Sequence, residues 1–295
     1  GRLEAMGVNV LWANKIMHHK MMIVDGPRDN RERPATAKIA TRSGNWSYGA
    51  ATRYDENTLI VQDQPALLLE FQREFEHLWA HSRDFVYDDT LPYELGAAEI
   101  TDALIERLRD ANNIAEAHFT SDNFRVRGET TFSIIRGSNA ISDALVEAIE
   151  GATESIHIAS GHLRSRPVSE ALIAAKAADP ALDIKVYLDG QEYISSYYHG
   201  VQLDELDACL VEAGDSLARQ EDCTDKGFYF GYTLGEEHGI DVRYKHYSYR
   251  WHYSYAVQMH HKYLIIDGDT VISGSYNLSD NAEHNTMENM VWYTE

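Results

Sequence analysis

Two stretches of the sequence decide its fold: MHHKMMIVDG at residues 17–26 and MHHKYLIIDG at residues 259–268. Each lies inside a longer repeat. The first copy also contains GVNVLW from Gly7, SGNWS from Ser43 and ENTLIV from Glu56, and the second contains GIDVRY from Gly239, SYNLS from Ser275 and ENMVWY from Glu288. Asn45 precedes Glu56 by eleven residues, as Asn277 precedes Glu288. Four linked blocks in one order indicate two copies of one structural unit.

A regular alternation of apolar segments lies ahead of the second copy. It runs from a strand at Thr131 (TFSIIR) through the helix ISDALVEAIEGA, the strand SIHIAS and the helix VSEALIAAKAA to a strand from Asp183 (DIKVYLD). Strands of period two that alternate with helices of period 3.6 predict an α/β fold. We therefore expect mostly buried β-sheets flanked by helices.

The two copies differ in what surrounds them. Nothing like the run from Thr131 precedes the first copy, and no counterpart of the helix ALLLEFQREFEHLWA follows Glu295. We expect residues 1–85 to be the C-terminal part of a first domain, 86–130 a connection, and 131–295 a second domain without its last helix. The repeat predicts that a pseudo-twofold axis relates the two domains, with the first incomplete.

Composition limits the kinds of partner. The chain has 26 Lys and Arg against 47 Asp and Glu, a net charge of −21, which disfavours broad binding to duplex DNA. No apolar run is long enough to span a bilayer, and the opening residues show no export signal, so the compartment stays open. The two cysteines, Cys209 and Cys223, could form one loop-closing bridge or remain independent thiols.

The chemistry-bearing residues recur as His-x-Lys-x4-Asp in both copies. Side chains two apart on a strand share a face, so His18 points with Lys20 and His260 with Lys262, while His19 and His261 point away. Parity places the following aspartates on the opposite face. We interpret Asp25 and Asp267 as supports at the strand ends of the catalytic motif.

Phosphodiester cleavage needs a nucleophile, a proton donor for the leaving oxygen and donors for the phosphoryl oxygens. The paired histidines and lysines supply these groups. The hydroxyls and amides that follow are candidate phosphate ligands: Ser43, Asn45, Ser275 and Asn277. Glu56 and Glu288 are the matched carboxylates that could hold a neutral imidazole in one tautomer.

These motifs resemble those of the phospholipase D superfamily, whose members bring two His-Lys-Asp motifs together in one site. The second copy matches the pattern including its Gly-Ser-x-Asn, whereas Arg42 stands where Gly274 does. The resemblance implies a covalent phosphohistidine, the same role for the two glutamates, and no cofactor or metal. It also implies that the first motif supplies the nucleophile, His18, and that His260 protonates the leaving group.

The substrate class is open at this level. A phospholipid at a membrane surface is the favoured substrate, cleaved or transferred as a phosphatidyl group; single-stranded nucleic acid is the alternative, and a catalytically silent scaffold a third hypothesis. An aromatic insertion holds five rings in strict alternation: Tyr247, Tyr249, Trp251, Tyr253 and Tyr255. These rings could cage a quaternary ammonium headgroup, stack bases, insert as a lip at a membrane interface or pack on the sheet. Metal binding is disfavoured because His18 and His19 face apart. Both motifs lie in one chain, so no oligomer is required.

Overall fold

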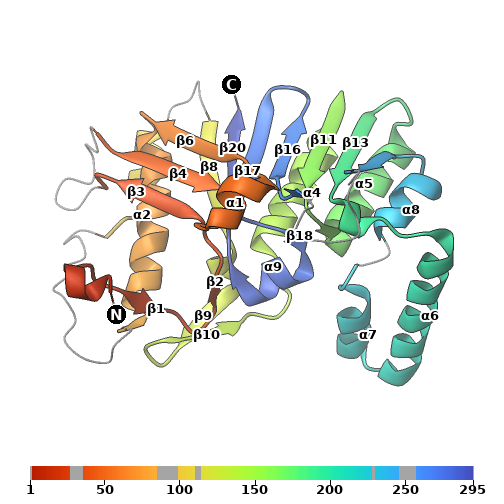
Figure 1. Cartoon of the computed structure of the whole chain (residues 1–295), viewed down its shortest axis with the longest axis horizontal. Coiled ribbons are helices and arrows are strands. Elements are labelled where there is room, and N and C mark those ends of the chain that lie inside the picture. The colour runs from red at the N-terminus through yellow and green to blue at the C-terminus, as the bar shows by residue number, and fades with distance from the viewer. Residues whose placement is uncertain are drawn as a thin grey trace.

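The computed structural model of the chain describes residues 2–26, 36–84, 99–109, 114–227, 230–245 and 257–294. Two sheets form its framework (Figure 1). The large sheet has seven strands, in the order β14 (Asp241–Tyr244), β13 (Asp183–Leu188), β11 (Ser155–Ser160), β16 (Lys262–Ile266), β17 (Thr270–Gly274), β20 (Asn289–Thr294) and β8 (Ile114–Phe119). The small sheet is antiparallel, in the order β3 (Met21–Val24), β4 (Lys38–Arg42) and β6 (Thr58–Gln62).

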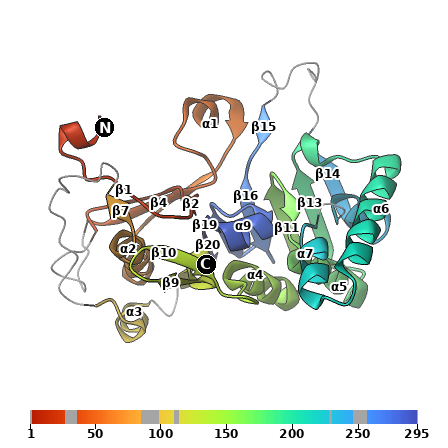
Figure 2. The ribbon, with the colours of Figure 1, turned by 90° about the horizontal axis from the view of Figure 1, so that it is seen from below.

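The large sheet is parallel at one edge and antiparallel at the other. β11, β13 and β14 run parallel, while β16, β17, β20 and β8 each run antiparallel to the strand before. Alternate residues of β11 and β13 are buried under α4 (Ala140–Gly151) and α5 (Arg166–Ala178). Figure 2 shows these helices on one side of the sheet and α1 (Tyr48–Arg53) on the other. The predicted α/β class is confirmed.

The small sheet is covered by α2 (Pro65–Ala80), which begins with a proline at its first turn, where the missing N–H costs nothing. The apolar face of α2 packs on this sheet and also on β8 of the large sheet. Residues Leu67, Leu68 and Phe71 form one buried cluster with Ile39, Val61, Ala115, Phe119 and Val291. Helix α2, which follows the first repeat in the chain, therefore helps to bury β8, the edge strand of the large sheet.

The strand from Thr131 occupies a different place from the one that the α/β alternation suggests. It forms β10 (Thr131–Ile134), which pairs with β9 (Phe124–Arg127) in a separate antiparallel hairpin. The edge of the large sheet is taken by β8, which lies within the segment interpreted as a connection and pairs with β20 along six residues. β8 is held there by α2, a contact that the local pattern of residues 131–134 does not reveal. The domain boundaries stay a prediction.

The remaining helices lie at the periphery or near the site. They are α3 (Asp102–Leu108), α6 (Ser196–Ala213), α7 (Leu217–Thr224), α8 (Phe230–Glu236) and α9 (Asp280–Asn285), with short 3-10 turns at η1 (Glu4–Met6), η2 (Thr120–Asn123) and η3 (Gly190–Glu192). A disulfide joins Cys209 in α6 to Cys223 in α7, with the Cα atoms 5.9 Å apart. Of the two possibilities for the cysteines, the structure shows the bridge.

Some predictions lie outside the described residues. The aromatic residues Tyr247, Tyr249, Trp251, Tyr253 and Tyr255, and most of the polar stretch after Asp25, belong to this group. Within the part of the chain that the structure describes, no helix is both long and apolar enough to cross a membrane.

Candidate active site

Each catalytic motif begins on a short strand that takes its partner from the other repeat. β2 (Ile16–Met17) runs parallel to β19 (Thr286–Met287), and β15 (Gln258–Met259) runs parallel to β5 (Tyr54–Asp55). The pairing extends one residue further, because the His18 amide donates to the Met287 carbonyl (3.1 Å) and the His260 amide to the Asp55 carbonyl (3.0 Å). Each histidine is thus fixed beside the glutamate of the opposite repeat.

The histidine side chains follow the same exchange. Nδ1 of His18 lies 2.6 Å from a carboxylate oxygen of Glu288, and Nδ1 of His260 lies 2.9 Å from one of Glu56. A carboxylate only accepts, so Nδ1 carries the proton and Nε2 is left for chemistry. Burial would raise the pKa of Glu56, but hydrogen bonds from His260 and Ser43 lower it, which keeps this carboxylate ionised.

Ser43 and Ser275 hold the glutamates. Each hydroxyl donates to the glutamate of its own repeat at 2.6 Å, Ser43 to Glu56 and Ser275 to Glu288. Each hydroxyl oxygen also accepts from the backbone amide of the residue after that glutamate. The hydroxyl hydrogen is therefore already donated, and the structure does not direct either serine, predicted as a phosphate ligand, toward a phosphate.

Two asparagines that the sequence reasoning missed connect the repeats. Asn57 donates from its side chain to the Ser273 hydroxyl at 2.6 Å, and its equivalent Asn289 accepts from the Thr41 hydroxyl at 2.7 Å. Asn289 also donates to Nδ1 of His19 at 3.0 Å. The signal was the dipeptide Glu-Asn, which is present in both copies. These asparagines fix the strands that carry the glutamates.

The lysines are nearly inaccessible to water, 2% exposed for Lys20 and 1% for Lys262. Nζ of Lys20 donates to the His18 carbonyl at 2.8 Å, and Nζ of Lys262 donates to the His260 carbonyl at 3.0 Å and lies 3.1 Å from Nε2 of His260. Burial lowers the pKa of Lys20 to about 8 and that of Lys262 to about 7. Burial likewise lowers the pKa of His260.

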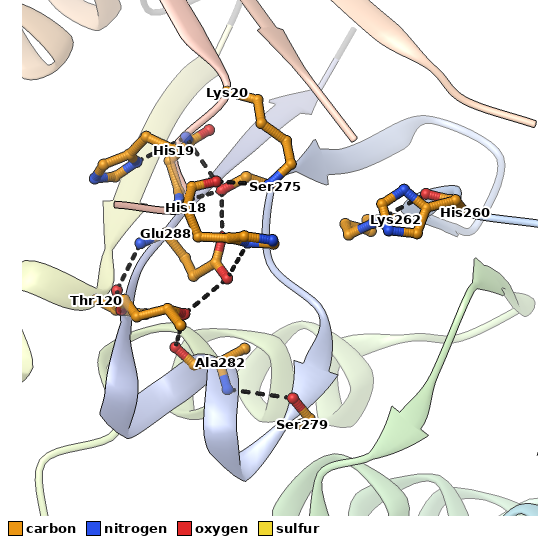
Figure 3. Close-up of polar contacts among 12 residues, drawn as sticks. His18, His19, Lys20, Thr120, His260, Lys262, Ser275, Ser279, Ala282 and Glu288 are labelled. Carbon is orange, nitrogen blue, oxygen red and sulfur yellow. Dashed lines mark hydrogen bonds and ion pairs between the residues drawn. The ribbon is translucent and has the colours of Figure 1, made fainter. Parts of the chain in front are cut away.

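The two motifs share one electrostatic environment. Burial has the largest effect on the pKa of Lys20, and the charges of Glu288 and Glu56 oppose it by raising this pKa. The charge of Lys20 in turn contributes to the lowered pKa of His260. Figure 3 shows His18 and Lys20 on one side and His260 and Lys262 on the other. His19 points away from them and is buried, with Nε2 2.9 Å from Glu74. The structure thus brings the predicted histidines, lysines and glutamates together.

The aspartates lie at the far ends of the motif strands. Asp267 accepts hydrogen bonds from the backbone amides of Thr153, Glu154 and Ser155 at 2.7–2.8 Å. Burial opposes ionisation, but these bonds lower its pKa to about 2. Asp25 accepts from the Thr36 hydroxyl at 3.1 Å. Both backbones have positive φ, 54° and 51°, in keeping with a turn after the strand. Their contacts are those of supports and not of groups facing the histidines.

The asparagines predicted as phosphate ligands have different surroundings. Asn45 is exposed, whereas Asn277 is half-buried and its Oδ1 is buried without a hydrogen-bond partner. The difference has a local cause. Asn277 precedes β18 (Leu278–Ser279), which pairs with β12 (Leu163–Arg164), and no such strand flanks Asn45 among the described residues. In the same described part, no cluster of three or more His, Cys, Asp or Glu side chains could hold a metal.

Comparisons with known proteins identify the family of the chain. The model of a family described as cardiolipin synthase, PLD-like domain, matches residues 1–79 and 145–295. The chain belongs to this phospholipase D-like family, which confirms the resemblance seen in the motifs.

Individual relatives are more distant. Mitochondrial cardiolipin hydrolase of Xenopus tropicalis is 33% identical over 90 residues, which cover 30% of this chain and only 38% of that protein. Among solved structures, the phospholipase D family member Nuc from Salmonella typhimurium is 17% identical, with a TM-score of 0.36 over 62% of this chain and 84% of that one. Phosphatidylserine synthase from Haemophilus influenzae is 10% identical, with a TM-score of 0.47 over 95% and 58%.

Proposed function

We propose that this protein is a phosphodiesterase that cleaves or transfers a phosphatidyl group through a covalent phosphohistidine. The observation that carries the proposal is the pair of imidazoles, each with Nδ1 bonded to the buried glutamate of the other repeat. We take the two Nε2 atoms as the reacting atoms, one for attack and one for proton transfer. Nε2 of His260 lies 3.1 Å from Nζ of the buried Lys262, and the buried Lys20 follows His18 by two residues. Such a set supplies nucleophilic, acid–base and electrostatic catalysis together.

The proposed first step uses His18 as the nucleophile. The lone pair on its Nε2 attacks phosphorus, a phosphorus–nitrogen bond forms, and the bond from phosphorus to the leaving oxygen breaks. A proton on Nε2 of His260 passes to that oxygen. Lys262 lies 3.1 Å from this nitrogen and has a pKa of about 7, so it can supply the proton. Lys20 keeps its proton and neutralises the phosphoryl oxygens while Lys262 gives up its own, and Ser43 and Ser275 hold the glutamates.

The second step regenerates the enzyme. A water molecule, or an alcohol in transfer, attacks phosphorus opposite the nitrogen while its proton returns to His260. The phosphorus–nitrogen bond breaks and its electron pair returns to His18. Asn277, whose Oδ1 has no hydrogen-bond partner among the described residues, follows Ser275 by two residues and is assigned with Asn45 to substrate contact.

A phospholipid is the proposed substrate. The matched family and its curated relative are named for cardiolipin. The net charge of −21 disfavours long nucleic acids, which depend on a basic surface for binding. We therefore propose a membrane surface as the place of reaction, and both motifs in one chain make a second subunit unnecessary.

The test separates the two histidines. We expect His18→Ala to abolish release of 4-nitrophenolate from bis(4-nitrophenyl) phosphate, whereas His260→Ala retains first-step release because this leaving group departs without an acid. On a phospholipid, loss of the acid should cost about 10²- to 10⁴-fold. After quenching in alkaline denaturant, which preserves a phosphorus–nitrogen bond, mass spectrometry should find the phosphoryl label on His18.

The matched control is His157→Ala, since His157 is also paired with a carboxylate, Asp183 at 2.9 Å, but lies on an exposed sheet face. This variant should keep full activity. A label on His260 would reverse the assignment. Turnover of single-stranded DNA but not of phosphatidylcholine would overturn the substrate class, and no turnover of any phosphodiester would leave the scaffold hypothesis.

A further inference from the structure

A third histidine–glutamate pair lies outside the catalytic motifs. His162 lies in the two-residue link between β11 and β12, and its Nδ1 lies 2.8 Å from Oε1 of Glu192 in η3. The Glu192 side chain is only 6% exposed. Arg164 donates to both oxygens of the same carboxylate, from Nε at 3.0 Å and from Nη2 at 2.6 Å. The motif pattern did not reveal this pair, because His162 belongs to no repeated block.

The residues on either side of His162 lie next to segments of the candidate active site. The amide of the preceding residue, Gly161, donates to the His261 carbonyl at 3.1 Å. A Cβ atom on Gly161 would lie 3.8 Å from Cδ2 of the His260 ring. On the other side, Leu163 pairs with Leu278, the residue that follows Asn277. The chain that carries His162 therefore runs between the segment of the proposed acid, His260, and the strand that follows Asn277.

The partners of His162 fix its chemical character. Burial would raise the pKa of Glu192, but hydrogen bonds from His162 and Arg164 lower it, so Glu192 is an ionised acceptor. Nδ1 of His162 must then be its N–H donor, and a neutral ring presents Nε2 as an acceptor. The side chain is 29% exposed, and Nε2 has no hydrogen-bond partner among the described residues. The neighbouring lysines, by contrast, offer only donors.

We propose that His162 is a specificity-determining residue whose Nε2 accepts a hydrogen bond from a hydroxyl group bound next to the phosphorus. The hydroxyl belongs either to the headgroup of the substrate or to an alcohol that accepts the phosphatidyl group. Glu192 and Arg164 are positioning residues that hold the imidazole in the required tautomer. This inference rests on the proposed phosphodiesterase function.

The experiment compares two substrates in mixed micelles with the full chain. Phosphatidylglycerol carries hydroxyls on its headgroup, and phosphatidylcholine carries none. We expect His162→Ala to lower kcat/KM for phosphatidylglycerol by about tenfold, the size of one hydrogen bond, and to leave phosphatidylcholine within twofold. His162→Gln should recover part of the loss because its amide oxygen can replace Nε2 as acceptor.

A second arm identifies the source of the hydroxyl. With phosphatidylcholine and added glycerol, the ratio of phosphatidylglycerol to phosphatidate formed is measured. If the hydroxyl belongs to the acceptor, His162→Ala lowers this ratio and leaves total turnover unchanged. His157→Ala, in β11 five residues before His162 and also paired with a carboxylate, should change neither arm.

Two outcomes would overturn the role of His162. One is an equal loss on both phospholipids and in transfer, which would indicate a general effect on the site. The other is an unchanged variant in both arms. An inactive unmodified protein would instead contradict the proposed function and the inference with it, so the two failures are distinguishable.

Discussion

The most unusual residues of the site are its two lysines. Burying an ammonium group disfavours the charged form, which is why the pKa of Lys262 falls to about 7 and that of Lys20 to about 8. The charged form is the one that binds a phosphodiester anion. It is present below these pKa values and is lost as the pH rises through them. The alkaline side of the activity profile should therefore report the lysines of the free enzyme.

We predict that kcat/KM on a phosphodiester falls as the pH rises above about 7 to 8. The free energy of unfolding should show the opposite trend. From there to about pH 10, the unfolded chain keeps protons on lysines that the native state has lost, so stability increases with pH. A pH series of initial rates and of urea unfolding curves checks both. An activity profile that stays flat to pH 9 would contradict the lowered pKa values.

At the scale of elements, the backbone at Gly274, the last residue of β17, is packed more closely than the equivalent backbone in the first repeat. A Cβ atom on Gly274 would lie 2.1 Å from the carbonyl oxygen of Asn289, a contact that no side chain can make. Arg42 occupies the equivalent position without disturbing the motif. The same backbone hydrogen bond is present in both repeats. The Ser43 amide donates to the Asn57 carbonyl at 3.0 Å, and the Ser275 amide donates to the Asn289 carbonyl at 2.9 Å.

We predict that Gly274→Ala lowers the free energy of unfolding by about 1–3 kcal/mol, since β17 and β20 must separate to make room. Because Asn289 follows Glu288, activity should fall as well. Gly151→Ala, at a position with open space around it, is the matched control and should be nearly neutral. Urea unfolding and phosphodiesterase assays measure the two effects. A variant as stable as the unmodified protein would show that the contact is relieved at no cost.

For the whole molecule, the exchanged contacts mean that neither repeat pairs its own motif histidine, His18 or His260, with its own glutamate. Glu288 is 270 residues from His18, and Glu56 is 204 residues from His260. The strand pairs β2 with β19 and β15 with β5 repeat the same exchange in the backbone. This is the pseudo-twofold relation that the repeat predicts, and it places the site between the repeats.

We predict that double-mutant cycles on unfolding free energy show coupling of about 0.5–3 kcal/mol between Glu56 and His260. The variants Glu56→Gln and His260→Ala, singly and together, provide the cycle. Glu56→Gln with His18→Ala is the control, since those two residues share no hydrogen bond, and it should be additive within about 0.5 kcal/mol. Stronger coupling of Glu56 to His18 would mean that the glutamates serve their own repeats.

The sequence by itself determined the α/β class, the two copies and the identity of the paired histidines, lysines and glutamates. It could do so because strand parity and repeat spacing are local properties of the chain. His18 and Lys20 share a face for any regular strand, whatever lies opposite.

Tertiary structure alone decided which residues meet. It gave each glutamate to the histidine of the other repeat, used Ser43 and Ser275 to hold those glutamates, and put β8 in place of the strand from Thr131 at the sheet edge. It also brought Gly161, the residue before His162, beside His260. These contacts join segments far apart in the chain, and their partners are chosen by how the repeats pack and by the need to satisfy every buried polar group, which no local pattern encodes.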